Sequence, residues 1–443
     1  MSMIDSEPRI KVALLQSHKE AKIKLNGHFS LPDSRKITGY LKIRTEKGQV
    51  LLIESPCVQT SGQKEISLLA HNGATFTVFN VQIGIDFHWQ RSQEQSFRGN
   101  LLLSANSTSL FDLINEIPLE DYIESVISSE MSALAPLEFL KAQAIVARSW
   151  LVAMLERKQK HCSNSNFEKA GNSEIISWHD ISDHQHFDVC ADDHCQRYQG
   201  ITKITSENIA KAIQATRGLF LVYTDEICDA RYHKACGGQT EIFSTAWEDK
   251  SLPYLQSTAD HDNTHAPIKS EKDAENWLRN KPPAYCNTVD KKILSQILPS
   301  FDQETLDFYR WEIIYKRQDL EKIIWKKSGI DIGKLQNIIP IERGPSGRIW
   351  KLKIEGSKRN IVVGKELEIR RWLSESHLLS SAFVVSTELE NNGKVSCFIL
   401  SGGGWGHGVG LCQIGAAVMA SKGFKAPDIL AHYFTGAVLK KLY

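Results

Sequence analysis

A glutamate, Glu130, stands at a position where the spacing of its neighbours predicts a buried apolar residue. The apolar residues before it recur at the i, i+3, i+4, i+7 spacing of a helix packed on one face: Leu119, Tyr122, Ile123, Val126 and Ile127. Glu130 returns to that face, which predicts a half-buried carboxyl group. Burial disfavours the charged form and raises the pKa above the ordinary ~4.3, toward the range useful in proton transfer. The alternative is a structural glutamate at a helix C-terminus, bonded to nearby backbone.

Histidine and cysteine gather in the stretch WHDISDHQHFDVCADDHCQRYQG, residues 178–200. Its metal-type side chains are His179, His184, His186, Cys190, His194 and Cys195. Zinc prefers thiolate and imidazole ligands in tetrahedral geometry. Cys190 and Cys195 with one upstream histidine would supply three ligands and leave a fourth position for water or another ligand. The spacing departs from C-x-x-C pairs, and a Cys190–Cys195 disulfide or two free thiols is the alternative.

The run SGGGWGHGVGLCQIGAAVMASKG, residues 401–423, places Trp405 and His407 among six glycines. So many glycines indicate a close approach of the backbone to another group. They never give G-x-G-x-x-G after a strand, which excludes a dinucleotide loop. We expect a flat, extended ligand such as a sugar chain to stack on Trp405; a tight structural turn around a core tryptophan is the alternative. A helix is expected from about Gln413 to Gly423.

Two consecutive helices are predicted to position Glu130. The first begins after Ile117, with Pro118 suited to a first helical turn and acidic residues near the positive end of the helix dipole, and ends at Glu130. Pro136 restarts a second helix, LEFLKAQAIVARSWLVAML, whose alanines permit close packing. Together they would form an αα-hairpin with Glu130 near its corner.

The rest of the chain mixes strand and helix patterns, which predicts an α+β fold. Short β-like runs occupy the N-terminal part, and a clear alternating strand, IWKLKIEG, lies in a later mixed segment. We expect four parts: a β-rich region 1–110, a core 111–260 containing a long polar loop 157–200, an inserted α+β subdomain 261–395, and a C-terminal core segment 396–443.

Composition narrows the function classes. The chain has 443 residues and a formal net charge of +1, which gives no global attraction for nucleic acid or an anionic membrane. Residues 1–30 lack the pattern of a signal peptide, and no apolar run reaches the ~18 residues of a membrane span, so we expect a soluble chain without a transmembrane segment. The nine cysteines do not form a dense disulfide framework. Cys228 and Cys236 are expected to be small buried residues or a local disulfide.

Five ordered motifs resemble the sporulation protein D and amidase-enhancer family, SpoIID/LytB. They are IPLEDYIESVISSEM, LKAQAIVARSW, CQRYQG, ARYHKACGGQTE, and GGGWGHGVGLCQIGA with ILAHYFTG. They span roughly residues 110–260 and 396–443, and the segment between them resembles the family's variable insertion.

The resemblance implies a peptidoglycan lytic transglycosylase that cuts between N-acetylmuramic acid and N-acetylglucosamine and leaves a 1,6-anhydro end. Glu130 matches the family's catalytic glutamate, acting as acid and then as base. Arg148 would orient it or bind a sugar substituent. The partners implied are glycan strands and a cell-wall amidase, with action in the cell envelope or outside the cell; a cytoplasmic location stays open.

The resemblance also bears on the other candidate residues. Some family members bind zinc through a histidine and two cysteines in this loop, which implies a structural zinc on Cys190 and Cys195 with His184 or His186. His194 would then face the cleft and contact substrate. Trp405, His407 and Gln413 lie in the family's glycine-rich motif and would contact the substrate, with a purely structural role as the alternative for His407 and Gln413.

Two other functions stay open from the sequence. The chain could be a non-catalytic module that binds wall material or an amidase and raises the activity of that partner. Alternatively, zinc-bound water could hydrolyse an amide.

Overall fold

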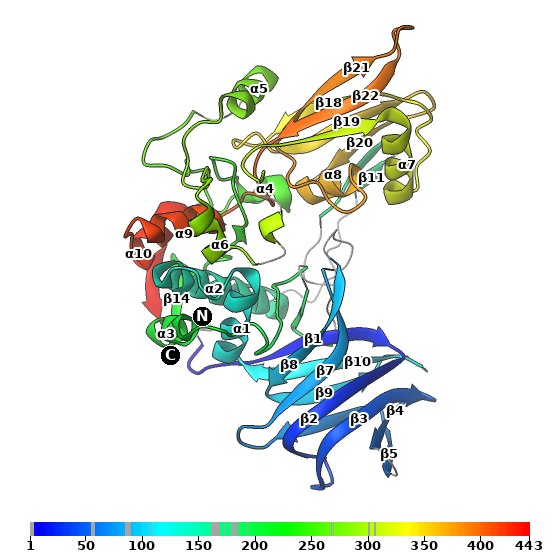
Figure 1. The fold of residues 1–443 in the computed structure, drawn as a ribbon, viewed down its shortest axis with the longest axis vertical. Helices are drawn as coiled ribbons and strands as arrows, with labels where there is room; N and C mark the ends of the chain where they lie inside the picture. The colour runs from blue at the N-terminus through cyan, green and yellow to red at the C-terminus, as the bar shows by residue number, and fades with distance from the viewer. Residues whose placement is uncertain are drawn as a thin grey trace. The chain divides into compact units, whose positions relative to one another are not determined.

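The computed structural model confirms the α+β class, with helices and strands throughout the chain (Figure 1). It describes residues 4–54, 58–84, 90–107, 109–160, 169–171, 173–178, 184, 186–192, 194–266, 268, 270–299, 302–304 and 307–443. Within these residues, no helix is both long and apolar enough to cross a bilayer.

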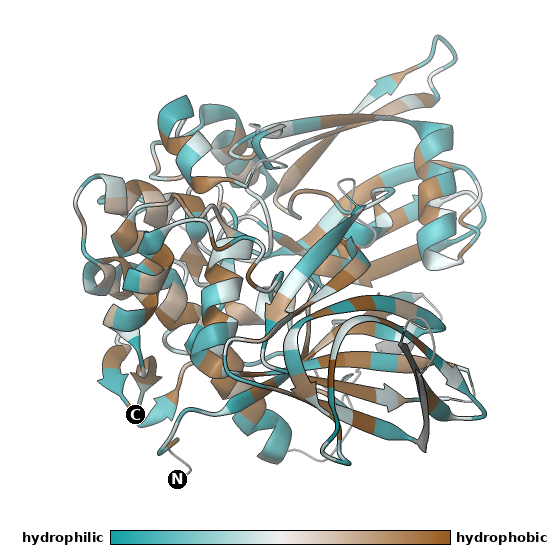
Figure 2. Cartoon of the chain, turned by 60° about the horizontal axis from the view of Figure 1, so that its bottom comes forward, coloured by the Kyte–Doolittle hydropathy of each residue, from teal (hydrophilic) through white to brown (hydrophobic). Residues whose placement is uncertain are grey.

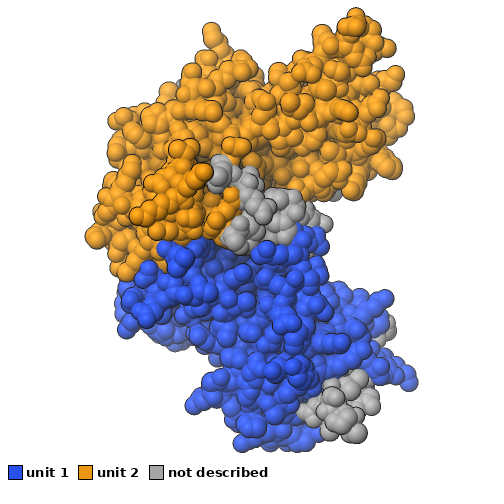
Figure 3. Space-filling view, viewed as in Figure 1, with its two compact units in different colours: residues 1–134, 183–219, 441–443 blue, residues 135–182, 220–440 orange. Residues whose placement is uncertain are grey.

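The chain forms two compact units (Figure 3). Unit 1 comprises residues 1–134, 183–219 and 441–443, and unit 2 comprises residues 135–182 and 220–440. Each unit therefore combines segments that are far apart in the sequence. The four sequence-based domains stay a prediction.

Unit 1 is built on an eleven-stranded sheet. Its strands are β1 (Arg9–His18), β2 (Glu20–Ser30), β3 (Lys36–Glu46), β4 (Gln49–Glu54), β5 (Val58–Gln63), β6 (Glu65–Ala70), β7 (Thr75–Ile83), β8 (Arg91–Arg98), β9 (Asn100–Ala105), β10 (Phe111–Pro118) and β13 (Val189–Cys190). Nine of them follow the order β13-β1-β10-β9-β6-β2-β3-β4-β5, and β7 pairs with β2 and β8. The pairs are antiparallel except β1 with β13, where Ala13 faces Cys190.

Apolar and polar residues alternate along these strands, as expected for a sheet with one buried face (Figure 2). Aromatic rings continue the core from the sheet to the first helix. Phe76 stacks on Phe97, Phe97 on Tyr198, and Tyr198 on Tyr122, with ring centroids 5.4, 5.7 and 5.2 Å apart. This row of rings anchors the end of the histidine and cysteine stretch, at Tyr198, to the sheet.

The helices of unit 1 are α1 (Leu119–Glu130) and α3 (Glu207–Thr216). Helix α1 begins after Pro118, carries Glu120 and Asp121 in its first turn, and ends at Glu130, as predicted. Helix α3 begins at Ser206, whose side chain accepts the Asn208 N–H.

Unit 2 contains the other elements. They are α2 (Leu137–Lys160), β11 (Lys169–Gly171), β12 (Glu174–Ile176), β14 (Leu219–Tyr223), β15 (Glu226–Ile227), β16 (Tyr232–His233), α4 (Phe243–Ala246), α5 (Glu271–Asn280), α6 (Lys291–Ile297), η2 (Asp302–Glu304), β17 (Trp311–Lys316), α7 (Arg317–Ser328), β18 (Leu335–Arg343), β19 (Ile349–Gly356), β20 (Asn360–Gly364), α8 (Glu366–Trp372), β21 (Phe383–Leu389), β22 (Val395–Gly402), β23 (Leu411–Cys412), α9 (Gln413–Ser421), α10 (Ala426–Tyr433) and β24 (Val438–Lys441).

An apolar core joins the two larger sheets of unit 2. Buried side chains of β17–β22, including Trp311, Leu352, Val363 and Leu400, pack with Ile324 of the neighbouring helix α7. The sheets have the orders β11-β12-β20-β19-β18 and β17-β22-β21. The strand predicted at IWKLKIEG is therefore the centre of a folded core.

The segment 157–200 differs from the long loop that the sequence predicts. Helix α2 continues to Lys160, β12 pairs in parallel with β20, and β13 pairs in parallel with β1. These strands have three and two residues and pair with chain far away in the sequence, so they leave no local periodicity. The predicted αα-hairpin joins a helix of unit 1 to one of unit 2 and stays a prediction.

Candidate functional site

Glu130 is the last residue of α1, and its side chain is partly buried. The chain leaves the helix at once, because Met131 is extended at φ −130° and ψ 174°. The Arg197 backbone N–H donates to Glu130 Oε1 at 3.0 Å. The hydrogen bond to backbone that the structural alternative predicts is therefore present. The same bond orients the carboxyl group, which a catalytic role would also require.

The segment that carries this N–H, residues 195–200, is held tightly in unit 1. Tyr122 Oη donates to Gln196 Oε1 at 3.1 Å, and Tyr198 Oη donates to Asn115 Oδ1 at 2.5 Å. Burial, together with the charges of Cys195, Cys190 and Glu130, raises the pKa of Tyr122 well above its usual value. Tyr122 therefore stays a neutral donor beside both Glu130 and the cysteines. Sequence reasoning assigned no role to the Arg197 N–H, although the motif CQRYQG contains it.

Four side chains that can bind a metal lie just before that segment and at its first residue, Cys195. His184, Cys190, His194 and Cys195 have ligand atoms within 4.8 Å of one another. His184 Nε2 lies 3.2 Å from Cys195 Sγ, and His194 Nδ1 lies 3.5 Å from Cys195 Sγ and 4.0 Å from Cys190 Sγ. Ligands of a tetrahedral zinc are about 3.3–3.8 Å apart, given Zn–S and Zn–N distances of about 2.3 and 2.0–2.1 Å. The group thus fits zinc in both donor type and size.

The chemistry of the thiols agrees with a metal-binding group. Cys190 and Cys195 are free, which removes the disulfide alternative for this structure. Hydrogen bonding to Cys195, and to His184 and His194, holds the pKa of Cys190 well below its usual range despite burial. A thiolate is the form that binds a metal.

The structure distributes the predicted ligands unevenly. His184 is in the group, whereas His186 is not one of its four members. His194, which the sequence suggested as a substrate contact, is the fourth member and is also solvent-exposed. The sequence-based prediction leaves the fourth position to water or another ligand, and the structure places His194 Nδ1 beside both thiols.

Arg148 lies on α2 in unit 2, wholly buried. Its Nη1 donates to Ala144 O at 3.4 Å, and its guanidinium lies 6.0 Å from the Phe220 ring centroid. The sequence placed it correctly on a helix, while its role toward Glu130 stays a prediction.

The glycine-rich segment packs against a buried arginine. Arg348 Nε donates to Gly406 O at 3.1 Å, and its Nη1 donates to Cys236 O at 3.1 Å. Gly408 has φ +81°, and a Cβ there would lie 2.4 Å from Arg348 Cζ. At Gly408, the close backbone approach that the glycines indicate is therefore an approach to Arg348. No sequence pattern points to this partner, which lies sixty positions upstream.

Trp405 and His407 are both partly buried. Trp405 is fixed by two backbone bonds with Ala235, and the Lys234 ammonium lies 5.9 Å from its ring. His407 Nδ1 accepts the Val409 N–H at 3.1 Å, and its ring lies 4.8 Å from that of Trp247. Burial, with the nearby His233 and Arg231, lowers the pKa of His407 well below its usual value. A neutral imidazole and a partly buried indole are suited to contact an uncharged sugar.

Gln413 is the first residue of α9 and is only 2% exposed. Among the described residues, no hydrogen-bond partner reaches its Nε2. This burial favours a structural role, and a contact with substrate stays a prediction.

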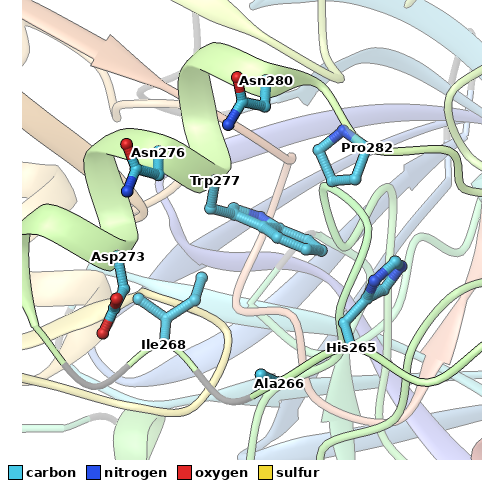
Figure 4. A pocket seen from close by; sticks show the side chains of 8 residues that line it. All are labelled: His265, Ala266, Ile268, Asp273, Asn276, Trp277, Asn280 and Pro282. Atoms are coloured by element: carbon cyan, nitrogen blue, oxygen red, sulfur yellow. The ribbon is translucent and has the colours of Figure 1, made fainter.

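A hollow in unit 2 lies along α5 (Figure 4). The Trp277 indole projects toward His265 and Pro282, and Asn276 and Asn280 stand on the same helix. An aromatic face beside amide groups is the chemistry that binds polar, ring-shaped ligands. The sequence analysis did not single out these residues.

Comparisons with known proteins agree with the resemblance predicted from the sequence. Residues 107–223 match the family model described as "Stage II sporulation protein", and residues 241–410 match one described only as a domain of unknown function. The chain is 26% identical over 334 residues to stage II sporulation protein D of Bacillus amyloliquefaciens, which covers 73% of this chain and 74% of the relative. It is 26% identical over 331 residues to the protein of the same name from Bacillus subtilis strain 168, covering 74% and 76%.

A third relative carries a different name. The amidase enhancer of Bacillus subtilis strain 168 is 26% identical over 325 residues, which cover 72% of this chain but 40% of the relative. Together these matches confirm the resemblance to the sporulation protein D and amidase-enhancer family.

Proposed function

From the premise that this chain is related to stage II sporulation protein D and the amidase enhancer, we propose that it is a peptidoglycan lytic transglycosylase. The bond cut is the one between N-acetylmuramic acid and N-acetylglucosamine, and the product carries a 1,6-anhydro end. The proposed site of action is the cell envelope or the exterior of the cell.

The observation that carries the proposal is the geometry at Glu130. The carboxyl group ends a helix, is partly accessible, and has one oxygen oriented by the Arg197 N–H at 3.0 Å. Glu130 also lies within residues 107–223, which match the family model. A carboxyl group with one oxygen held by backbone offers a fixed direction for proton transfer.

The reaction needs one acid and base. Glu130, protonated, gives its proton to the glycosidic oxygen as the bond from that oxygen to the muramic anomeric carbon breaks. The 6-hydroxyl of the same muramic residue then forms a bond to the anomeric carbon, and its proton returns to the Glu130 carboxylate. No water is consumed, so the product is lighter by one water molecule than the product of hydrolysis.

A hydrolase would require a second carboxylate placed for a nucleophile or a water. Glu124, on the same helix, accepts from Arg98 Nη1 at 2.7 Å. This ion pair engages the Glu124 carboxylate, which supports the single-glutamate mechanism.

The other candidate residues are assigned supporting roles in the proposal. Trp405 and His407 contact the glycan, whereas Arg148 is wholly buried and is given no direct contact with it. A zinc ion bound by His184, Cys190, His194 and Cys195 would stabilise the conformation of this loop. The chain's own contribution is then the segment 195–197, which presents the Arg197 N–H to Glu130.

A second candidate function is favoured by the similarity to the amidase enhancer. In that case the chain binds glycan strands or an amidase and raises the activity of that partner without cutting the glycan. Glu130 would then have no chemical role.

One experiment separates the candidates. Purified glycan strands, with and without stem peptides, are incubated with the wild type, Glu130→Gln and the control Glu124→Gln, and the ends are identified by mass spectrometry. We expect anhydro ends from the wild type and Glu124→Gln, and a loss of about 10²–10⁴-fold in Glu130→Gln. Reducing ends alone, or full activity of Glu130→Gln, would contradict the proposal. Loss of cleavage on chelation in a chain that stays folded would favour a metal-catalysed reaction.

A further inference from the structure

A second group of side chains that can bind a metal lies in unit 2, and nothing above assigns it a role. It consists of Cys236, Asp260, Cys286 and Cys412, whose ligand atoms all lie within 4.8 Å of one another. Cys236 is 3% exposed and the other three are 0% exposed. The group is therefore sealed from solvent, unlike the group around Cys190.

Four separate segments bring these side chains together. Cys412 ends β23 and precedes α9, and the parallel pairing of β16 with β23 brings it next to the chain that carries Cys236. The Asp260 N–H donates to Gly238 O at 3.0 Å, which places Asp260 beside the same chain. The Cys286 N–H donates to Asp260 Oδ2 at 2.7 Å. The group thus depends on the tertiary fold of unit 2.

The distances fit a tetrahedral ion. Cys236 Sγ lies 3.6 Å from Cys286 Sγ, and both cysteines, like Cys412, are free. Two thiolates on one tetrahedral zinc are about 3.8 Å apart, given Zn–S distances of about 2.3 Å. A disulfide would instead require about 2.05 Å between the sulfurs.

Hydrogen bonds around the group orient its members as they do around bound metals. The Cys236 N–H donates to Cys412 Sγ at 3.3 Å, and the Gly238 N–H donates to Cys236 Sγ at 3.3 Å. Tyr433 Oη donates to Asp260 Oδ1. Such outer partners fix ligand geometry and stabilise thiolate and carboxylate forms.

Charge gives an independent argument. Asp260 is fully buried, and among the ion pairs of the described residues none includes it. A buried carboxyl group without a cationic partner is costly to ionise, and three adjacent thiols offer no positive charge. Gly415 is needed to admit this carboxylate, because a Cβ there would lie 2.2 Å from Asp260 Oδ1. A divalent cation would offset the cost.

We propose that Cys236, Asp260, Cys286 and Cys412 bind a structural zinc ion. Three sulfur ligands select zinc over magnesium or calcium, and four protein ligands with no exposed position exclude a catalytic site with open coordination. The ion would link the start of α9, and with it the glycine-rich segment, to the chain around Cys286. The proposal does not depend on the proposed function.

The test uses the full chain carrying Cys190→Ser and Cys195→Ser, so that the group in unit 1 cannot bind. The protein is purified under reducing conditions with zinc, and zinc per chain is measured by elemental analysis. We expect about one zinc per chain, with X-ray absorption showing three sulfurs at about 2.3 Å and one oxygen at about 2.0–2.2 Å. Adding Cys286→Ser or Asp260→Asn should lower zinc retention at least about tenfold, as loss of a ligand does.

Cys228→Ser is the matched control, because Cys228 is another fully buried free thiol of unit 2 outside the group. It should retain zinc. Absence of zinc, a shell with two or fewer sulfurs, equal retention after Cys286→Ser, or a Cys236–Cys286 disulfide in the purified protein would each overturn the proposal. The X-ray absorption measurement is made on the protein that keeps all four ligands, so it tests the proposal even if a ligand variant fails to fold.

Discussion

At Glu130, a single backbone contact makes glutamine an informative replacement. The Arg197 N–H donates to Glu130 Oε1 at 3.0 Å, and the carbonyl oxygen of glutamine can accept the same hydrogen bond. Glu130→Gln should therefore remove the proposed proton transfer while leaving this contact in place.

Tyr198 supplies the hydrogen bond that joins the Glu130-holding segment to the sheet. Its Oη donates to Asn115 Oδ1, and both residues are at most 1% exposed. Tyr198→Phe leaves a buried acceptor unpaired, which should lower the free energy of unfolding by about 1–3 kcal/mol in urea denaturation. Tyr40→Phe makes the same chemical change on a side chain that is 60% exposed, and it should have no measurable effect. An equal loss in both variants would contradict this role.

His407 should make stability depend on pH. Its pKa in the folded protein lies well below the ordinary 6.5, chiefly through burial, so the unfolded chain binds more protons below about pH 6.5. The stabilising contribution is present above pH 6.5 and is lost as the pH falls toward the folded pKa, by up to about 1.4 kcal/mol per pH unit.

His407→Asn cannot titrate and retains an acceptor for the Val409 N–H. Urea denaturation between pH 7 and pH 4 should therefore show a weaker decline for this variant than for the wild type. His28→Asn, on an exposed position of β2, controls for loss of an imidazole. Parallel curves for His407→Asn and the wild type would refute the assignment.

In the glycine-rich segment, both the backbone conformation and the packing of neighbouring side chains favour glycine. Gly408 and Gly423 both have positive φ, at +81° and +97°, but a Cβ on Gly408 meets Arg348 whereas one on Gly423 meets nothing within 4 Å. Gly423→Ala should cost about 1 kcal/mol for the backbone alone. Gly408→Ala should cost about 2 kcal/mol more, because Arg348 is fully buried and cannot move away freely. Equal unfolding free energies for the two variants would show that Arg348 yields.

The elements that the sequence predicts well have local signals. Helix α1 follows from apolar periodicity and its acidic first turn, and α9 begins at Gln413, where the glycines stop. The strands β12 and β13 were missed because their partners, β20 and β1, are far away in the chain. Non-local pairing of two or three residues leaves no pattern that a sequence can display.

The same limit applies to the functional groups. His184, Cys190, His194 and Cys195 lie close together in the chain, so their density was visible. The group around Asp260 draws on four distant segments, and the sequence predicts for Cys236 only a small buried residue or a local disulfide. Glu130 was recognised from its neighbours, whereas the Arg197 N–H that orients it is backbone and carries no residue type to find.

At the scale of the whole molecule, each candidate metal group is contained in one compact unit. His184, Cys190, His194 and Cys195 belong to unit 1, and the group of Cys236 belongs to unit 2. Metal binding to a folded unit stabilises that unit by mass action. The two units should therefore respond separately to loss of their own ion.

Hydrogen exchange tests this separation directly. In the Cys190→Ser/Cys195→Ser protein, chelation should raise amide exchange in unit 2, at β16, β23 and the start of α9, and leave the sheet of unit 1 unchanged. If free zinc initially exceeds its dissociation constant about 100-fold, the loss corresponds to about 2.7 kcal/mol, or about 100-fold in protection. In the converse protein, Cys236→Ser/Cys286→Ser, chelation should instead expose the chain around β13 and residues 195–200. Equal increases in amide exchange in both units, in either protein, would contradict this prediction. They would mean that the two units unfold together, because loss of an ion that stabilises one unit alone would raise exchange in that unit only.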